Sequence, residues 1–270
     1  MKSILKIVLL IIAFQKVDAQ IVHDPIGARA WSLGGSSTAE SNVFSVNNNM
    51  ASSAELKNYQ LGIYNQTRFG VKELNLINSS FVLPTKFIHL GLSINHYGYE
   101  KYNQQNFSLG IAKKLNNNFN LGVTLNYLTI NIAEQENTGA LTGSLSAFYK
   151  INKNLQLGVL LFNPTQSNYH INTYGKVNTF GRIGVKYQVN KSVYLIGDLD
   201  KTFEQETILR GGINYALHPN FDLSLGYANN PNYLTFGFNA KIKQMDLAFA
   251  ASMHEILGFT PHIGLIFYGK

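Results

Sequence analysis

The sequence predicts an all-β protein, namely a transmembrane up-and-down antiparallel β-barrel of about 14 strands with an N-terminal plug-like segment. The prediction rests on an N-terminal export signal, on repeated short segments with a hydrophobic period of two, and on connections that alternate between short and longer. The expected organisation is a signal peptide over residues 1–19, a plug or cap over residues 20–58 and the barrel over residues 59–270.

The first 19 residues have the three parts of a secretory signal. Two lysines form a positive n-region, residues 7–14 form an apolar core, and residues 17–19 place small side chains before the expected cleavage at Gln20. The alternative is an N-terminal membrane anchor, but an anchor needs about 18 or more apolar residues, and Gln15 ends this run much earlier. The sequence therefore predicts an exported protein.

Composition excludes several classes of function. The formal net charge of the 270-residue chain is +7 and is spread along the sequence, without a Lys/Arg cluster interleaved with aromatics, so we expect no nucleic-acid partner. The chain has no cysteine, so this exported protein is held together without disulfides. Charged residues make up only 14%, while there are 15 Tyr and 17 Phe, which is unlike a typical soluble enzyme.

Residues 27–54 follow the signal and are rich in Ala, Ser, Gly and Asn, without strand alternation. They form either a mobile linker or, as we favour, a compact plug against the β-structure that follows. Three motifs stand out in this stretch: Gly27-Ala28-Arg29-Ala30, Leu33-Gly34-Gly35 and Asn48-Asn49-Met50-Ala51-Ser52-Ser53-Ala54.

These motifs resemble the N-terminal signature of FadL-like outer-membrane barrels, and more narrowly of the PorV/PorQ-like branch associated with type IX secretion in Bacteroidetes-type bacteria. The chain departs from that pattern in two places. Met50 stands where the family has proline, which removes a fixed φ from the turn, and the acidic stretch is reduced to Glu40. The resemblance implies a barrel in the bacterial outer membrane and a plug motif that comprises Gly27, Ala28, Arg29, Ala30, Gly34, Gly35, Asn48, Asn49 and Ala51.

The body of the chain alternates apolar and polar or small residues, as in residues 119–127 and 221–227. A soluble β-sandwich gives the same alternation, so a single strand does not decide between the two folds. The candidate strands are Tyr59–Phe69, Leu74–Leu83, Phe87–Tyr97, Asn106–Lys113, Phe119–Ile132, Ala140–Tyr149, Leu155–Asn163, Thr179–Tyr187, Val193–Asp200, Thr207–Tyr215, Phe221–Tyr227, Tyr233–Ile242, Met245–Met253 and Thr260–Tyr268.

The connections favour the barrel. Short polar turns are expected at residues 84–86, 116–118, 152–154, 190–192, 218–220 and 243–244, and mostly longer connections at 70–73, 98–105, 133–139, 164–178, 201–206, 228–232 and 255–258. This alternation is typical of an up-and-down meander with tight turns at one rim and longer loops at the other. An exported chain without a helical span favours closure, because lipid tolerates no unpaired strand edge. The last strand ends in Phe267 and Tyr268, and an aromatic there resembles the signal read by barrel-assembly machinery.

Aromatic residues and glycines have positions that suit a barrel. Tyrosines near strand ends fit an interfacial girdle, although tyrosine also favours strands in general. These tyrosines are Tyr59, Tyr97, Tyr127, Tyr149, Tyr187, Tyr215, Tyr227, Tyr233 and Tyr268. The many strand glycines, such as Gly122, Gly158 and Gly226, weaken strands unless lumen space or curvature requires them.

No motif indicates catalysis: the chain has no Gly-x-Ser-x-Gly elbow, no His-Glu-x-x-His and no phosphate loop. We therefore expect no catalytic residue, no cofactor and no metal. The seven histidines are scattered and are assigned to turn or lumen positions rather than to a metal site: His23, His89, His96, His170, His218, His254 and His262.

Charged residues on the polar strand faces are candidate lumen residues. Asp198 and Asp200 share one face and form either an acidic pair or, as we favour, the end of a strand beside Lys201. Four bases also lie on polar faces, and form either a basic strip for anionic groups or, as we favour, one half of a charge balance. The bases are Arg182, Lys186, Arg210 and Lys241, and the balancing acids are Asp198, Asp222 and Asp246.

Three functions are considered for such a barrel. The first is a non-enzymatic PorV/PorQ-like accessory of type IX protein secretion or surface attachment, with secretion-machinery or surface proteins as partners and the loop at 164–178 as contact element. The alternative is a FadL-like channel for hydrophobic small molecules, in which residues 27–54 act as a hatch. The third, an outer-membrane lipase or protease, lacks its motifs. In every case outer-membrane lipid surrounds the protein.

Overall fold

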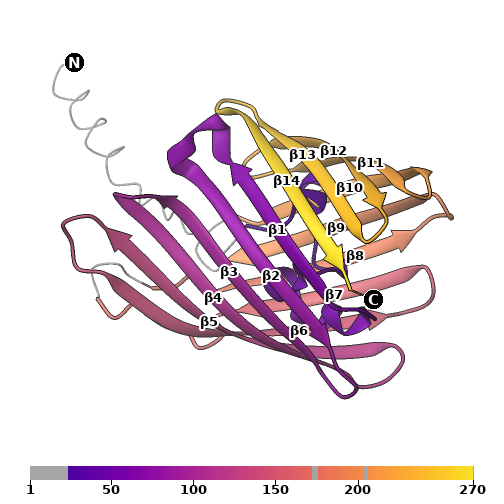
Figure 1. Ribbon diagram of the computed structural model, residues 1–270, viewed down its shortest axis with the longest axis horizontal. Coiled ribbons are helices and arrows are strands. Elements are labelled where there is room, and N and C mark those ends of the chain that lie inside the picture. The colour runs from indigo at the N-terminus through magenta and orange to yellow at the C-terminus, as the bar shows by residue number, and fades with distance from the viewer. Residues whose placement is uncertain (1–23, 172–175, 203–205, 270) are drawn as a thin grey trace.

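The computed structural model describes residues 24–171, 176–202 and 206–269. The expected signal peptide over residues 1–19 lies outside the described residues, as does the start of the expected plug. In the described chain, 14 antiparallel strands close into one barrel, with β1 paired to β14 and every other strand paired to its neighbours in sequence (Figure 1). The predicted all-β barrel of about 14 strands is confirmed.

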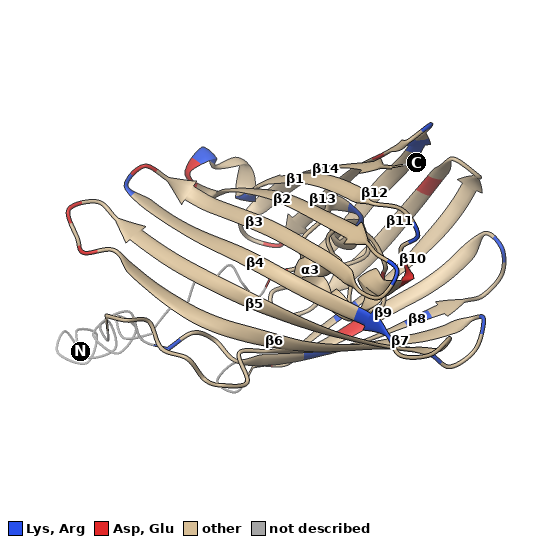
Figure 2. Cartoon of the chain, turned by 60° about the horizontal axis from the view of Figure 1, so that its bottom comes forward, with Lys and Arg blue, Asp and Glu red and all other residues tan. Residues whose placement is uncertain are grey.

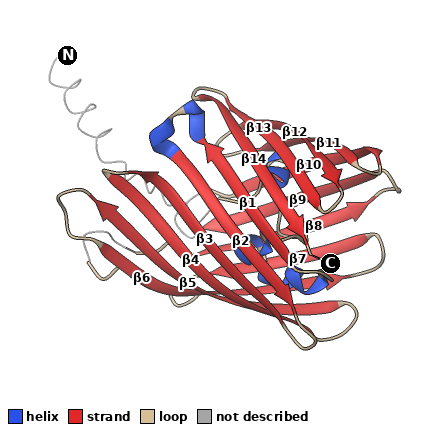
Figure 3. Ribbon diagram, in the orientation of Figure 1, coloured by secondary structure: helices blue, strands red, loops and turns tan. Residues whose placement is uncertain are grey.

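The strands are β1 (Gln60–Thr67), β2 (Asn75–Pro84), β3 (His89–Tyr99), β4 (Tyr102–Lys114), β5 (Phe119–Ile132), β6 (Thr138–Lys150), β7 (Leu155–Phe162), β8 (Phe180–Gln188), β9 (Val193–Thr202), β10 (Ile208–His218), β11 (Phe221–Ala228), β12 (Tyr233–Ile242), β13 (Met245–His254) and β14 (Gly258–Tyr268). The helical turns are α2 (Ala28–Ser32), α3 (Ser45–Asn48), η2 (Met50–Glu55), η3 (Arg68–Gly70) and η4 (Lys72–Leu74) (Figure 3). None of the helices within the described ranges is long and apolar enough to cross a membrane.

Each strand follows the predicted alternation, with apolar side chains outside and polar or small ones inside. In β5 the odd residues from Leu121 to Tyr127 are exposed, whereas the even residues from Asn120 to Asn126 are buried. Outward Leu, Ile, Val and Phe suit contact with lipid, and inward Asn, Ser and Thr bond to one another across strands. The exterior is therefore that of a membrane-spanning barrel.

The two rims differ in their connections. At the rim where β1 begins and β14 ends, here called the terminus rim, the strands are joined by residues 85–88, 115–118, 151–154, 189–192, 219–220 and 243–244. The opposite rim, here called the loop rim, carries the longer connections, up to residues 163–179. The connection expected at 98–105 is wrong. β3 continues to Tyr99 and β4 begins at Tyr102, because the Asn- and Gln-rich ends of these strands still pair their backbones.

Only part of the tyrosine set faces outwards. Tyr59, Tyr127, Tyr149, Tyr187, Tyr215 and Tyr227 are exposed on the barrel surface, as a girdle requires. Tyr97, Tyr233 and Tyr268 are instead inside: Tyr97 is buried, the Tyr233 ring packs edge-on against Trp31, and the Tyr268 hydroxyl donates to Asp246. Their strand position alone did not show this, because one residue of shift moves a side chain to the other face.

Residues Asp24–Leu56, here called the lumenal segment, lie inside the barrel (Figure 2). Asp24 forms an ion pair with Arg68 in the connection between β1 and β2, at the loop rim. Glu55 contacts Lys150 and Asn120 at the terminus rim, just before the chain enters β1. The segment thus traverses the lumen from the loop rim to the terminus rim.

Candidate functional site

The strand glycines make room for the lumenal segment. A Cβ on Gly158 would lie 2.0 Å from the Thr38 carbonyl oxygen, and a Cβ on Gly226 would lie 2.1 Å from the Gly34 nitrogen. Both distances are far below any real contact, so the backbone of the segment touches the barrel wall at these points. Gly34 itself has φ +72°, a conformation that favours glycine.

Asn48 joins the two ends of the segment. The Ile26 N–H donates to Asn48 Oδ1 at 2.9 Å, and Asn48 Nδ2 donates to the Ile26 carbonyl at 2.8 Å, with both residues buried. The adjacent Asn49 donates to the Thr38 carbonyl at 2.7 Å and to Ala147 O in β6 at 3.1 Å. The two asparagines of the motif therefore act as internal clamps. The sequence motif contains them but does not show which groups they bond to.

Other motif residues serve the path of the chain. Gly27 precedes α2 with φ +116°, and a Cβ there would lie 2.9 Å from the Phe44 ring. Ala28 and Ala30 are buried in α2. Ala51 lies against β6, and its N–H donates to Ser146 Oγ at 3.0 Å. A Cβ on Gly35 would lie 3.2 Å from Arg210. The whole set thus lies inside the lumen.

Asp198 fastens the middle of the segment to β9. Its Oδ2 accepts three hydrogen bonds, from Ser37 N at 2.8 Å, Thr38 N at 3.0 Å and Thr38 Oγ1 at 2.7 Å. A carboxylate that accepts from backbone N–H groups gives a strong, charge-assisted contact. Asp198 is therefore an anchor for the turn around Thr38 rather than one half of an acidic pair.

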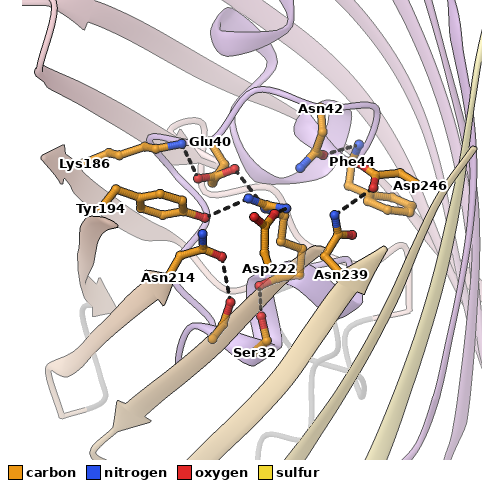
Figure 4. A network of polar contacts seen from close by, with 12 residues as sticks. Ser32, Glu40, Asn42, Phe44, Lys186, Tyr194, Asn214, Asp222, Asn239 and Asp246 are labelled. Carbon is orange, nitrogen blue, oxygen red and sulfur yellow. Dashed lines mark hydrogen bonds and ion pairs between the residues drawn. The ribbon is translucent and has the colours of Figure 1, made fainter. Parts of the chain in front are cut away.

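A second anchor is a buried charge network around Arg29 and Glu40 (Figure 4). Arg29 donates to Asp222 at 3.1 Å and to the Tyr194 hydroxyl at 3.2 Å, and lies 3.7 Å from Glu40. Lys186 in β8 donates to the other oxygen of Glu40 at 2.6 Å. Two charges of the segment are thus paired with charges of two strands, β8 and β11, and Arg29 also bonds to a hydroxyl of β9.

The environment fixes the charge state of Glu40. Burial alone would raise the pKa of this carboxyl, but the Lys186 ammonium and the Arg29 guanidinium outweigh burial and hold the pKa below its ordinary value of 4.5. Glu40 is consequently ionised at neutral pH, and its contact with Lys186 is an ion pair.

A third network lies within the strands. Asp200 accepts from Arg182 Nε at 2.5 Å and from Arg182 Nη2 at 2.9 Å, and lies 3.0 Å from Arg210 Nη2. All three side chains are buried. Asp200 does lie near the end of β9 beside Lys201, as expected, but it is also the counter-ion of both arginines. The register places Arg182 directly opposite Asp200, whereas Arg210 lies opposite Asp198, two residues away along β9.

The remaining candidate lumen charges have other surroundings. Asp246 accepts from Asn239 Nδ2 at 2.7 Å and from the Tyr268 hydroxyl at 2.7 Å. Lys241 is exposed near the terminus rim and lines a cavity there. The expected charge balance paired strand bases with strand acids. The partners of Asp222 and Lys186 are instead Arg29 and Glu40 of the segment.

Two cavities flank the lumenal segment. The loop-side cavity, of about 40 Å³, has a wall of amides and hydroxyls on β3–β6 and an apolar wall that includes Leu128, Leu160 and Phe162. Phe162 stacks on Phe180 at 5.2 Å between ring centroids, and Tyr169 and Val177 of the 163–179 connection cover this cluster. The terminus-side cavity, of about 200 Å³, lies between the segment and β12–β14. Ile26 borders both cavities, so its clamp to Asn48 stands between them.

Among the described residues, no group of three or more His, Asp or Glu side chains is arranged to hold a metal ion. His262 is buried, stacks on Trp31 at 4.8 Å between ring centroids and contacts Tyr64 and Ser252. It therefore belongs to the packing between α2 and the barrel wall, and His23 lies outside the described residues.

Comparison with solved structures identifies the fold. The toluene transporter TbuX of Ralstonia pickettii matches with a TM-score of 0.65 and 11% identity, over 91% of this chain and 97% of that chain. The toluene transporter TodX of Pseudomonas putida matches with 0.67 and 10% identity, over 91% and 98%. A FadL homologue of Pseudomonas aeruginosa matches with 0.61 and 11% identity, over 90% and 96%. The chain has the fold of FadL-type transporters.

No family model and no curated protein matches the sequence. None of the three solved structures above is described as an enzyme. The FadL-type fold, the closed barrel and its apolar exterior together place the protein in the bacterial outer membrane. In that membrane the short turns of the terminus rim face the periplasm and the loop rim faces outwards.

Proposed function

We propose that the protein is a channel through which hydrophobic small molecules cross the outer membrane, with the lumenal segment as its hatch. The observation that carries the proposal is the loop-side cavity, which is bordered by an apolar cluster that contains no residue of the lumenal segment. Small-molecule sites are commonly lined by apolar and aromatic side chains with some polar groups, and this cavity combines the apolar cluster with amides and hydroxyls. The transporters that share the fold support the same class of substrate.

The hatch is closed in this structure. Ligand sites for drug-sized molecules commonly have volumes of roughly 300–1,000 Å³, and the loop-side cavity has about 40 Å³. Passage therefore requires a shift of the lumenal segment, and the clamp between Ile26 and Asn48 separates the two cavities in the closed form.

The test is uptake of radiolabelled toluene by cells in which the outer membrane limits entry. Ser144→Phe fills the loop-side cavity from β6, and we expect uptake to fall to the level of cells without the protein. Leu145→Phe is the matched control, because the next residue points to lipid and leaves the lumen unchanged. Both variants are first checked for the heat-dependent gel migration of a folded barrel. Equal uptake by a folded Ser144→Phe barrel and the wild type contradicts the proposal.

The second candidate function is an accessory role in type IX protein secretion, and it rests on the N-terminal motifs described above. The connection at 163–179 is its expected contact element. Cross-linking in the native outer membrane, with a tag in this loop, tests it: capture of secretion-channel proteins in stoichiometric amounts supports the role, and capture of none removes it. No FadL-type neighbour found favours this branch over a channel.

A further inference from the structure

The exposed acids and lysines of the barrel are unevenly distributed between its rims, and the loop rim has both acids and four exposed lysines, Lys72, Lys101, Lys176 and Lys201. All six exposed acids of the described chain lie in connections of the loop rim, and they are Glu73, Glu100, Glu134, Glu136, Glu206 and Glu255. The terminus rim has no exposed acid in the described ranges and eight exposed lysines: Lys57, Lys86, Lys113, Lys114, Lys153, Lys191, Lys241 and Lys243. Figure 2 shows lysines on the turns at the end that holds the C-terminus, and both acids and lysines on the connections at the other end.

Six of these lysines form a belt on the outside of the terminus rim. Lys114 is not one of them because it pairs with Glu55, and Lys241 lines the terminus-side cavity. The belt consists of Lys57 before β1, Lys86 between β2 and β3, Lys113 on the outer face of β4, Lys153 between β6 and β7, Lys191 between β8 and β9, and Lys243 between β12 and β13. None of the ion pairs found within the described residues involves Lys153, Lys191 or Lys243.

Two of the belt lysines, Lys153 and Lys191, lie in turns of the same geometry. Asn152 Oδ1 accepts from Asn154 N at 2.8 Å and from Leu155 N at 2.9 Å, with Lys153 between them. Asn190 does the same with Ser192 N at 2.9 Å and Val193 N at 3.0 Å, around Lys191. Because the asparagine satisfies the turn, the next side chain makes no structural contact there and is exposed.

Exposed aromatic residues lie at the same level as the belt. Phe87 follows Lys86 directly and is 76% exposed, and Tyr149 and Tyr187 lie near the ends of the strands that lead into the turns of Lys153 and Lys191. Aromatic side chains at this position mark the boundary between lipid tails and headgroups. The ammonium groups of the belt therefore lie at headgroup depth rather than in free solution.

We propose that the lysine belt binds the phosphates of anionic phospholipids in the leaflet that surrounds the terminus rim. The distribution favours lipid over a protein partner, because the belt follows the circumference from β1 to β12, whereas a docked protein would cover one sector. Each lysine near an anionic lipid surface contributes attraction of about 1 kcal/mol, which is about fivefold in local lipid preference. The inference does not depend on what passes through the barrel.

The test measures the lipids retained by the full-length barrel after equilibration with equal amounts of phosphatidylglycerol and phosphatidylethanolamine, by native mass spectrometry. The belt variant is K86Q/K153Q/K191Q/K243Q, and the matched control is K72Q/K101Q/K176Q/K201Q at the loop rim, which removes the same charge. We expect the wild type and the control to retain phosphatidylglycerol preferentially and the belt variant to lose about fivefold of that preference. A variant with arginine at the same four belt positions should keep the preference for phosphatidylglycerol.

Two outcomes overturn the proposal. If both glutamine variants lose the preference equally, net charge rather than the belt attracts the lipid. If inorganic phosphate or a polyglutamate peptide displaces phosphatidylglycerol completely at an ionic strength of about 0.15 M, the lysines serve a soluble anion or an acidic protein instead. Both variants must show the heat-dependent migration of the folded barrel, so that loss of lipid is not loss of fold.

Discussion

Replacement of Asn48 by alanine tests how the lumenal segment is held. The side chain makes both of its hydrogen bonds to the backbone of Ile26, at 2.9 Å and 2.8 Å, and both residues are buried. The alanine leaves a buried N–H and a buried carbonyl without partners, at about 1–3 kcal/mol for each group. With about 3 kcal/mol in total, the population in which Ile26 is detached rises on the order of 100-fold.

The assay is amide hydrogen exchange of the folded barrel in detergent, resolved over residues 24–56. In Asn48→Ala we expect faster exchange near Ile26 and higher uptake of small hydrophobic probes, because the barrier between the two cavities is weakened. Asn47→Ala is the control: its side chain contacts Ser93 at 2.8 Å and Asn95 at 2.9 Å, and these polar partners also bond to neighbours on the wall. Equal protection near Ile26 in the two folded variants would refute the clamp.

Two further predictions concern the anchors of the segment. The pKa of Glu40 is below 4.5 in the folded protein, so its ion pair contributes stability above the unfolded pKa and loses this contribution as pH falls through the lower folded pKa. Amide hydrogen exchange in the segment should therefore become faster below about pH 4.5. In Glu40→Gln this pH dependence should be weaker, and exchange at neutral pH should be faster than in the wild type. Gly158→Ala should displace the segment, because a Cβ would lie 2.0 Å from Thr38 O. Gly143→Ala is the control and should be neutral, because the atom nearest to its Cβ would be 3.7 Å away. Protease sensitivity of the segment measures the difference, and equal sensitivity of the two variants would contradict the close contact.

The barrel could be predicted from the sequence because its physics is local. Period-2 alternation and short turns determine which face of each strand meets lipid, and in β5 this extends from Asn120 to Tyr127 without exception. Position near a strand end did not give the side of a tyrosine, whereas the alternation does. Tyr127 continues the exposed apolar face of β5, and Tyr97 continues the buried face of β3 that carries Ser93 and Asn95. The ends of β3 and β4 were also missed, because the polar residues at 102–105 continue a strand as well as they could form a loop.

The contacts inside the lumen could not be predicted from the sequence, because they join residues from distant parts of the chain. Arg29 and Asp222 are 193 residues apart, and Asp198 and Ser37 are 161 apart. A balance of the strand bases by Asp198, Asp222 and Asp246 was the natural expectation. Arg182 and Arg210 instead form ion pairs with Asp200, and Asp222 is paired with the segment. The motif around residues 27–35 signalled that the segment matters, but only the register of β8–β11 shows which charges it meets.

The two halves of the segment are held by different chemistry, and this decides which half moves at lower cost. On the β8–β11 side, Arg29, Glu40 and the Thr38 turn are held by buried charges, and breaking a buried ion pair costs about 3–5 kcal/mol. On the β2–β6 side, α3 and the start of η2 are held by neutral contacts of Asn47, Asn49 and Ala51, each worth about 1 kcal/mol. The ion pairs of Glu55 with Lys114 and Lys150 lie at the far end of η2, at the terminus rim. The neutral side borders the loop-side cavity. In a channel, α3 should therefore separate from the wall while α2 stays fixed, so hydrogen exchange in the presence of toluene should rise at residues 45–51 before residues 28–40. The reverse order would contradict this partition of the segment.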